Sequence, residues 1–591
     1  MLALHQFDYL LAIGFIFAFL DAWNIGANDV ANSFATSVSS RSLTYPQAAC
    51  LAAICEFLGA LLLGSRVADT IRNKIIAVDL FESSPATLML GMTCAIIGSS
   101  LWLTFATKIG LPVSTTHSIV GALIGVGVAC FGRDGVVWGW SGFSQIVASW
   151  FIAPAIAGAF AAILFMITKY GVLERGDKAL RNAFYLLPVY YCFTASVLCL
   201  VIVWKGAPNL HISDMSPGQI AGAVLGTAGG VLFLYLMFFL PYLRRRLVQE
   251  DWTMRWYHVF VGPTLWNRGP VPPAPPGVSV VQDYYRGHRV EMDDSTQSNG
   301  IIPSEKLPSQ EEDKEINLSE SESSQLPESE QLPPVEMRVA EGPSDRFFAR
   351  LAEIEKEGMA RKWYSPRGLL TRIEWAFTRG IRQDIIGHQQ QSKGGLLAGD
   401  AAARNRAAPQ YDNKVEYLYS FLQALTAGTA SFAHGSNDVS NAIGPFTTVW
   451  IVWKQNTVGS KNQVPVWILA YGGAAIAIGL WTYGYNIMRN LGNRLTPHSP
   501  SRGFSMELGA AITVVFASKL SLPISTTQCI VGATVFVGLC NGDWRAINFR
   551  MVGWCYLGWL ITLPCAGLMA GILMGIIINA PHFLEQYTLQ Y

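Results

Sequence analysis

Long apolar runs constrain this chain more than any other feature of its sequence. Thirteen such segments lie near residues 7–24, 46–64, 86–107, 109–130, 143–168, 183–204, 219–242, 417–433, 438–453, 465–488, 504–520, 522–540 and 551–579. A helix needs about 20 residues to cross a hydrocarbon core of about 30 Å. Of the 591 residues, 51% are hydrophobic and only 14% are charged, which excludes an ordinary soluble protein. The sequence therefore predicts an all-α polytopic membrane protein with about 12 transmembrane helices.

Several runs contain glycine, proline or polar residues, which predicts broken helices or re-entrant hairpins among the spans. The first run is expected to stay in the mature chain. Residues 1–8 lack the basic stretch of a cleavable signal peptide, and no small-residue cleavage site ends the run.

The chain divides into two apolar parts and a charged middle part. We expect residues 1–245 and 411–591 to be membrane regions, joined by a loop over residues 246–410. The cluster Arg244-Arg245-Arg246 at the end of a span indicates that this loop is cytoplasmic.

The loop itself has two kinds of sequence. Residues 270–343 are rich in proline, serine, glutamate and glutamine, and are expected to be disordered because they cannot bury enough apolar surface. Residues 345–385 mix aromatic and basic residues, which predicts an amphipathic segment on the inner leaflet, or a helix packed on another loop. The loop is either a plain linker or a target for a regulatory kinase or ubiquitin ligase.

Two motifs occur twice in the same order. Residues 26–33 read Gly-Ala-Asn-Asp-Val-Ala-Asn-Ser, and residues 435–441 read Gly-Ser-Asn-Asp-Val-Ser-Asn. Residues 108–122 and 519–533 agree at 10 of 15 positions and share Leu-Pro-x-Ser-Thr-Thr. The two motifs are separated by nearly the same distance in each copy, so the membrane region is a duplicated unit. Duplication is typical of transporters whose site lies between repeats, and we favour inverted repeats.

The Leu-Pro-x-Ser-Thr-Thr motif predicts a break followed by a new helix, since proline and Ser/Thr both favour helix starts. A helix N-terminus inside a membrane offers free N–H groups and a positive dipole end, which bind anions. The candidate ligands for a tetrahedral oxyanion in these turns are Ser114, Thr115, Thr116, Ser525, Thr526 and Thr527. The alternative is that these hydroxyls only bond their own helix backbone.

The paired acids Asp29 and Asp438 lie where a charged side chain is costly, which marks a functional site by default. Each can bind Na⁺ or accept a hydrogen bond from a protonated phosphate oxygen. Backbone carbonyls freed at Gly26 and Gly435 would add oxygen ligands. The candidate sodium ligands around them are Asn28, Asn32, Asn437 and Asn441. The alternative is a buried helix cap.

Two further acids, Glu56 and Glu507, lie in apolar runs at positions that do not match between the copies. Each is expected to bind a cation, carry a proton or meet a basic residue. Asp21 is similar but lies nearer the first motif. No P-loop, nucleophile elbow or metalloprotease helix is present, so the sequence predicts a transporter driven by an ion gradient rather than an enzyme. Sodium is the only metal expected, and no cofactor is.

With these motifs the chain resembles the inorganic phosphate transporter (PiT) family. The resemblance covers residues 5–245 and 412–585 and rests on the duplicated Asn-Asp and Leu-Pro-x-Ser-Thr-Thr motifs. Flanking stretches such as residues 137–142 and 500–504 are similar to fungal plasma-membrane sodium/phosphate symporters of that family.

The resemblance implies sodium-coupled import of phosphate across the plasma membrane by alternating access. It implies a central site at Asp29, Asp438 and the Ser-Thr-Thr turns, with Glu56 and Glu507 tied to sodium coupling. Proton coupling and a phosphate sensor that signals through the loop are the alternatives. The expected partners are phosphate, Na⁺ and the lipid bilayer, without nucleic acid; a homo-oligomer is left open.

Overall fold

The computed structural model describes residues 4–286, 356, 360 and 364–580, apart from residues 141, 206–214, 276–278, 382, 384, 392–396, 398, 459–462 and 521. In this part of the chain the regular secondary structure is helical, apart from one isolated bridge between Ile76 and Val136. Contacts divide the chain into a unit of residues 1–289 and 376–591 and a second unit of residues 290–375. Helix α12 (Pro366–Thr378) begins in the second unit, most of which lies outside the described residues.

The first copy of the duplicated unit begins with a span that passes through a π-helical turn. It consists of α1 (Asp8–Ile25), the turn η2 (Gly26–Val30), α2 (Ala31–Ser39), α3 (Tyr45–Leu63), α4 (Ser65–Asn73), α5 (Pro85–Ile109), α6 (Thr115–Phe131) and α7 (Phe143–Gly171). The side chain of Gln47 and the hydroxyl of Thr44 form a capping box that starts α3. Gly110, at φ 73°, ends α5 in the left-handed conformation that glycine adopts without strain.

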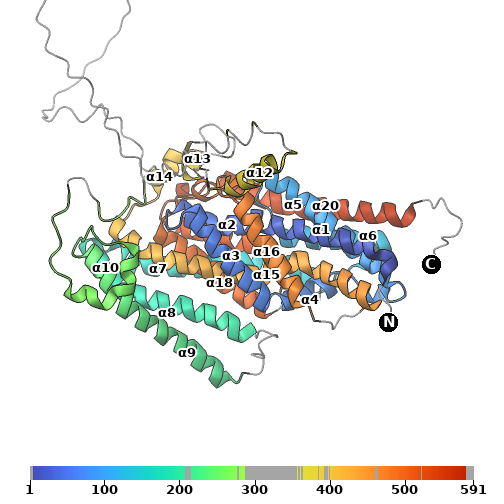
Figure 1. The fold of residues 1–591 in the computed structure, drawn as a ribbon, viewed down its shortest axis with the longest axis horizontal. Helices are drawn as coiled ribbons and strands as arrows, with labels where there is room; N and C mark the ends of the chain where they lie inside the picture. The colour runs from blue at the N-terminus through green and yellow to red at the C-terminus, as the bar shows by residue number, and fades with distance from the viewer. Residues whose placement is uncertain are drawn as a thin grey trace, which may run out of the picture. The chain divides into compact units, whose positions relative to one another are not determined.

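The second copy has matching breaks. It consists of α15 (Asn413–Gln455), α16 (Val466–Tyr483), α17 (Tyr485–Met488), α18 (Pro500–Lys519), α19 (Thr526–Leu539) and α20 (Phe549–Asn579). Between the copies lie α8 (Ala179–Lys205), α9 (Pro217–Leu234), α10 (Leu240–Leu247), α13 (Ile385–Gln391) and α14 (Ala401–Ala407). Helices α8 and α9 have no counterpart in either copy and lie side by side at one edge of this unit (Figure 1).

The predicted number of spans agrees with the helices found. In the described residues, nine helical stretches are long and apolar enough to cross a membrane. The more polar helices α15 and α18 and the short helix α19 bring the total to about twelve. One prediction was wrong: segments 417–433 and 438–453 are not separate but belong to the 43-residue helix α15. The polar stretch between them is buried in the protein, where no helix break is needed to satisfy it.

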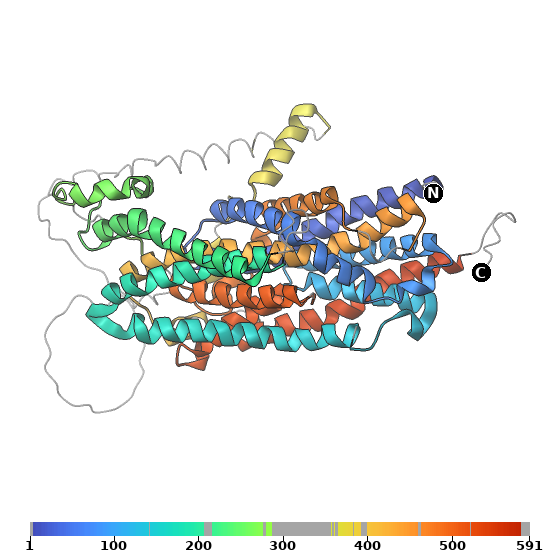
Figure 2. The ribbon, with the colours of Figure 1, turned by 90° about the horizontal axis from the view of Figure 1, so that it is seen from below.

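The two copies run in opposite directions. The backbone N–H of Leu4, before α1, donates to the carbonyl of Trp453, near the end of α15, at 2.8 Å. The indole of Trp453 also donates to Asp8 Oδ1 at 2.7 Å. Thus α1 begins where its counterpart α15 ends, and Figure 2 shows the long helices of this unit running along a common direction. The repeats are inverted.

Close helix contacts occur in reciprocal pairs between the copies. A Cβ atom on Gly26 would fall 1.9 Å from the carbonyl oxygen of Ile476, and one on Gly435 would fall 2.4 Å from that of Glu56. A second pair of contacts is matched between the copies in the same way. A Cβ atom on Gly59 would meet the carbonyl oxygen of Phe432, and one on Gly479 would meet that of Trp23. Small residues allow membrane helices to pack this closely. The matching contacts place the two Asn-Asp motifs at equivalent depths.

Candidate functional site

Each Leu-Pro-x-Ser-Thr-Thr turn is an extended break between two helices. Ser114 and Ser525 are the N-caps of α6 and α19, and each hydroxyl accepts a hydrogen bond at 3.3 Å from the backbone N–H three residues later. This capping role satisfies backbone donors that would otherwise be free in the membrane interior.

The first asparagine of each Asn-Asp motif holds a break in place. The amide of Asn28 donates to the carbonyl of Leu111 at 3.0 Å, and its oxygen accepts from the N–H of Val113 at 3.1 Å. In the second copy, Asn437 donates to the carbonyl of Ile524 at 3.0 Å. These contacts orient the turns. The amide oxygen of Asn437, unlike that of Asn28, has no hydrogen-bond partner in the described residues.

Asp29 receives donors from both copies. Its Oδ2 accepts hydrogen bonds from the Thr115 hydroxyl at 2.6 Å and from the Thr115 backbone N–H at 3.2 Å. Its Oδ1 accepts from the Thr527 hydroxyl of the second copy at 2.9 Å. The carboxylate is therefore bound by a helix N-terminus and by two threonines, the donors expected to surround an anion.

Asp438 has a similar but distinct set of partners. Its Oδ2 accepts from the Thr526 hydroxyl and lies 2.8 Å from Nε2 of His434. Its Oδ1 accepts from the Asn437 amide at 2.8 Å. The amide of Asn441 lies 3.5 Å from the same oxygen.

The second asparagines of the motifs are not equivalent. Asn441 donates across the repeat interface to the hydroxyls of Thr115 and Thr116, both at 3.1 Å. Its counterpart Asn32 is 5% exposed, and its amide nitrogen has no hydrogen-bond partner in the described part of the chain. The centre of the molecule is therefore asymmetric, because the amide nitrogen of Asn32 in the first copy is an unpartnered donor in the described residues.

Glu56 is joined to this centre by His434, a residue that sequence reasoning missed. Nδ1 of His434 lies 2.9 Å from Oε2 of Glu56, and Ser431 donates to Oε1 at 2.8 Å. Nδ1 of His434 is hydrogen-bonded to Glu56, and Nε2 lies within ion-pair distance of Asp438 without meeting hydrogen-bond geometry, so the arrangement fits an imidazolium between the two carboxylates. The available signal was an ionisable residue one helical turn before Asp438.

Glu507 is held by four neutral donors. Its two oxygens accept from Thr36 at 2.6 Å, Ser37 at 2.5 Å, Gln423 at 3.0 Å and Thr426 at 2.7 Å. These groups come from α2 and α15, so Glu507 ties the first helices of the two copies together. The three hydroxyl oxygens, with the carboxylate, form the oxygen-rich set that a hard cation uses. The amide oxygen of Gln423 is not part of this set, because it accepts from Ser40 and Ser42.

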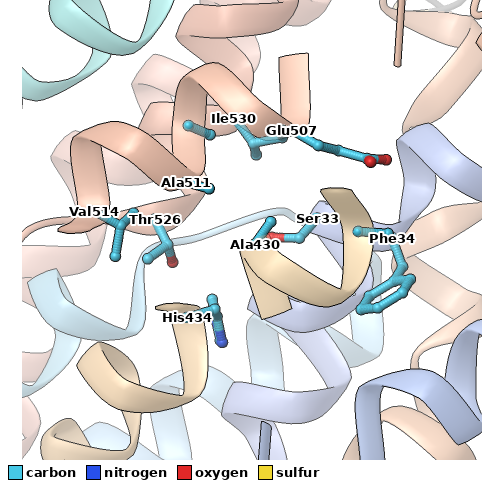
Figure 3. A pocket seen from close by; sticks show the side chains of 11 residues that line it. Ser33, Phe34, Ala430, His434, Glu507, Ala511, Val514, Thr526 and Ile530 are labelled. Atoms are coloured by element: carbon cyan, nitrogen blue, oxygen red, sulfur yellow. The ribbon is translucent and has the colours of Figure 1, made fainter. Parts of the chain in front are cut away.

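A small cavity of about 20 Å³ lies beside the centre, between α2, α15, α18 and α19 (Figure 3). His434, Glu507 and Thr526 border it, together with Ser33 and alanines of α15 and α18. It has room for about one water molecule, so a larger anion requires these helices to separate.

The carboxylates and imidazole can also form a cation site. Ligand atoms of Asp29, His434 and Asp438 lie within 4.8 Å of one another. The expectation that Gly435 frees backbone carbonyls for such a cation was wrong, because α15 continues through this position. In the first copy Gly26 begins the π-helical turn; both glycines are needed for the close contacts with α16 and α3.

An inverted duplication with facing helix N-termini and buried acids at its centre defines a secondary transporter. The comparisons agree. A model described as the phosphate transporter family matches residues 25–570. This chain belongs to the phosphate transporter family.

Relatives match over nearly the whole chain. The phosphate-repressible phosphate permease pho-4 of Neurospora crassa is 49% identical, with 98% of this chain and 99% of the permease covered. The sodium-dependent phosphate transporter 1 of Mus musculus is 32% identical, with 96% and 95% covered. A solved structure called the sodium-dependent phosphate transporter shares the fold, with a TM-score of 0.63, 24% identity, and 97% of this chain and 100% of that chain covered.

Proposed function

We propose that this protein is a sodium-coupled symporter that imports inorganic phosphate by alternating access between its inverted repeats. The observation that carries the proposal is the pairing of Asp29 and Asp438 with threonine hydroxyls at two facing helix N-termini. The names of the relatives support both the substrate and the coupling ion.

The same groups explain how phosphate and sodium would share one site. Thr115, Thr116, Thr526 and Thr527 donate to phosphate oxygens, with Ser114 and Ser525 holding the turns. A monovalent phosphate also carries hydroxyl groups, which can donate to Asp29 and Asp438 once the threonines turn toward the anion. Sodium offsets the repulsion between the carboxylates and the phosphate.

The sodium ligands that we propose are oxygen atoms around this centre. They belong to Asn28, Asn32, Asn437 and Asn441, with Glu56 and Glu507 as the coupling acids. Asn437 is the most favourable of these ligands, because its buried amide oxygen Oδ1 has no hydrogen-bond partner in the described region. The unpartnered atom of Asn32 is its amide nitrogen, a donor that does not bind a cation. The amide oxygen of Asn28 accepts from the N–H of Val113 and must give up this contact to bind an ion.

Uptake of ³²P-phosphate into proteoliposomes tests the proposal. With internal and external pH clamped at the same value, an inward Na⁺ gradient should drive accumulation that a K⁺ gradient does not. Uptake that is indifferent to Na⁺ would contradict sodium coupling.

Proton coupling is a second candidate, and the Glu56–His434–Asp438 chain favours it, since chains of ionisable groups are typical of proton pathways in membranes. In proteoliposomes without Na⁺ and without the pH clamp, an inward proton gradient would then drive phosphate uptake.

We further propose that the protein acts in the plasma membrane with residues 246–410 in the cytoplasm. The arginines at the end of α10 support this orientation. Most of the segment expected to be disordered, residues 270–343, lies outside the described residues. More than half of the segment expected to be amphipathic, residues 345–385, is described and contains helix α12. An epitope at residue 320 should be accessible only after cells are permeabilised. Residues 317–319 read Asn-Leu-Ser, a glycosylation sequon, and a glycan on Asn317 would contradict a cytoplasmic loop.

A further inference from the structure

Asp21 is a buried carboxylate that the proposed phosphate site does not use. It lies on α1, about two helical turns before Asp29, and its side chain is fully buried. Its Oδ1 accepts one long hydrogen bond, at 3.4 Å, from the hydroxyl of Ser100. Its Oδ2 has no hydrogen-bond partner within the described ranges. A buried carboxylate with so little compensation is strongly unfavourable unless a cation joins it.

Asn24, one turn further along α1, adds a second unsatisfied oxygen. Its amide nitrogen donates to the carbonyls of Leu20 at 2.9 Å and Ser100 at 3.4 Å, and to the hydroxyl of Thr104 at 2.9 Å. The Thr104 hydroxyl itself donates to Ser100, at 2.7 Å, so all three partners act as acceptors. This arrangement fixes the orientation of the amide, because a flipped group would set its oxygen against acceptors. The buried Oδ1 of Asn24 is then left without a donor in the part of the chain that the structure describes.

The polar cluster occurs in only one copy of the repeat. A residue of α1 is matched with the residue 409 positions later on α15, the offset that aligns Asn28 with Asn437. A residue of α5 or α6 is matched with the residue 411 positions later on α18 or α19, the offset that aligns Pro112 with Pro523. The polar residues Asp21, Asn24, Ser99, Ser100, Thr104 and Ser118 correspond to Ala430, Ala433, Ala510, Ala511, Val515 and Cys529. Equivalent helices of the second copy therefore pack with small apolar side chains. Helix packing alone does not require an acid at Asp21.

In the second copy, a small cavity lies at the position that corresponds to the polar cluster of the first copy. There, Ala430, Ala510 and Ala511 border the small cavity beside Thr526 (Figure 3). In the first copy the corresponding space holds oxygen atoms instead. The difference between the copies is thus a cavity on one side and an oxygen-lined cluster on the other.

The chemistry of the cluster selects its ligand. The two unsatisfied groups are both acceptors, so the missing partner is a cation rather than an anion. Carboxylate, amide and hydroxyl oxygens without sulfur or imidazole suit a hard ion, and a single carboxylate balances one positive charge. Asp29 acts on the Asp21 carboxylate electrostatically and adds negative potential. The Ser99 hydroxyl lies beside the same carboxylate and donates to Ser118 Oγ at 3.0 Å.

We propose that Asp21, Asn24, Ser99 and Ser100 form an additional Na⁺ site between α1 and α5. Thr36 and Ser37, which hold Glu507, follow Asp29 along the same span, whereas Asp21 precedes it. The new site therefore lies on the other side of the central acids from Glu507. The inference rests on sodium being the coupling ion of the proposed function.

Equilibrium binding of ²²Na⁺ to the purified full-length protein, without phosphate and with K⁺ as the background salt, tests this site. Asp21→Asn should bind one Na⁺ fewer per chain than the wild type. The half-saturating Na⁺ concentration for phosphate uptake should also rise, by about tenfold. Asp8→Asn, which changes an exposed acid on the same helix, should match the wild type in both measurements.

A triple variant tests whether a loss of Na⁺ binding by Asp21→Asn results from misfolding. Asp21→Ala, Asn24→Ala and Ser100→Ala together install the residues that the second copy already carries, and should also lose one Na⁺. Wild-type Na⁺ stoichiometry in both variants would overturn the site, including the case in which Asp21 binds a proton instead and only the pH profile shifts. A wild-type protein that binds no Na⁺ at all would overturn the sodium-coupled function as well.

Discussion

Thr527 of the second repeat donates a hydrogen bond to Asp29 of the first, with 2.9 Å between the hydroxyl and carboxylate oxygens. The matched threonine of the first repeat, Thr116, donates instead to the carbonyl of Ile524, at 3.2 Å. The central acid of one copy is thus held by the helix N-terminus of the other. Changes in the spacing of the repeats must alter this contact.

Thr527→Val keeps the shape of the side chain but removes this hydrogen bond. A buried bond to a carboxylate contributes about 1.5–3 kcal/mol, so phosphate uptake at limiting substrate should fall by about 10- to 100-fold. Thr534→Val on the same helix is the matched control, since the Thr534 hydroxyl bonds only the carbonyl of Ile530, at 2.7 Å. Equal uptake by the two variants, at equal surface expression, would remove Thr527 from the site.

His434→Gln should destabilise the protein by about 3–5 kcal/mol, because one amide group cannot serve both Glu56 and Asp438 and leaves a buried charge unpaired. The apparent melting temperature of the purified protein reports this change. The double variant Glu56→Gln/His434→Gln should regain most of the lost melting temperature but not phosphate transport. His117→Gln is the control, as Gln528 occupies the matched place in the second copy. A melting temperature unaffected by His434→Gln would mean that the ring does not bridge the acids.

Gly479→Ala should prevent the close packing of α16 on α1. The added Cβ would fall 1.9 Å from the carbonyl oxygen of Trp23, a backbone atom that cannot move aside alone. We expect little monodisperse protein in size-exclusion chromatography. Gly575→Ala on α20, where nothing lies within 4 Å of the new Cβ, should behave like the wild type. A monodisperse Gly479→Ala variant would contradict the packing of the repeats.

Residues 279–286 belong to the segment 270–343, which composition predicts to be disordered, but in the structure they contact helix α15. The hydroxyl of Tyr285 donates to Glu416 Oε1 at 2.7 Å, and the backbone N–H of Tyr284 donates to Asn413 at 3.0 Å. Both tyrosines are buried against α15. Composition did not predict this contact, because the residues around the two tyrosines are polar and rich in proline.

Deletion of residues 290–340 should therefore leave phosphate uptake intact, whereas deletion of 275–340 should lower stability because it uncovers the buried carboxylate of Glu416. Uptake and melting temperature of the two deletions separate these effects. Loss of uptake in the shorter deletion would show that the loop takes part in transport. Lost phosphate signalling with normal uptake would support a sensor role.

Local sequence was informative where the structure depends on local chemistry. The duplicated motifs predicted two repeats, and Leu-Pro-x-Ser-Thr-Thr predicted the helix starts at Thr115 and Thr526. The capping roles of Ser114 and Ser525 also follow from residue type. These features involve neighbours within a few residues, which a single sequence displays directly.

Contacts between the repeats could not be predicted in the same way. The pairing of Thr527 with Asp29, and that of His434 with Glu56, join residues that are hundreds of positions apart. They arise from the inverted packing of whole helices. The continuity of α15 was missed because hydropathy treats its buried polar centre as a gap between two spans. Hydropathy splits a membrane helix in this way wherever its polar centre is enclosed by protein rather than lipid.

The central claim is that Asp29 and Asp438 belong to one phosphate site built by both repeats. Equilibrium binding of ³²P-phosphate to the purified protein, with and without Na⁺, tests it most directly. We predict one phosphate per wild-type chain, bound only in Na⁺, and no measurable binding to either Asp29→Asn or Asp438→Asn at the same concentrations. Two phosphates per wild-type chain, with half of the binding retained in each variant, would contradict the account.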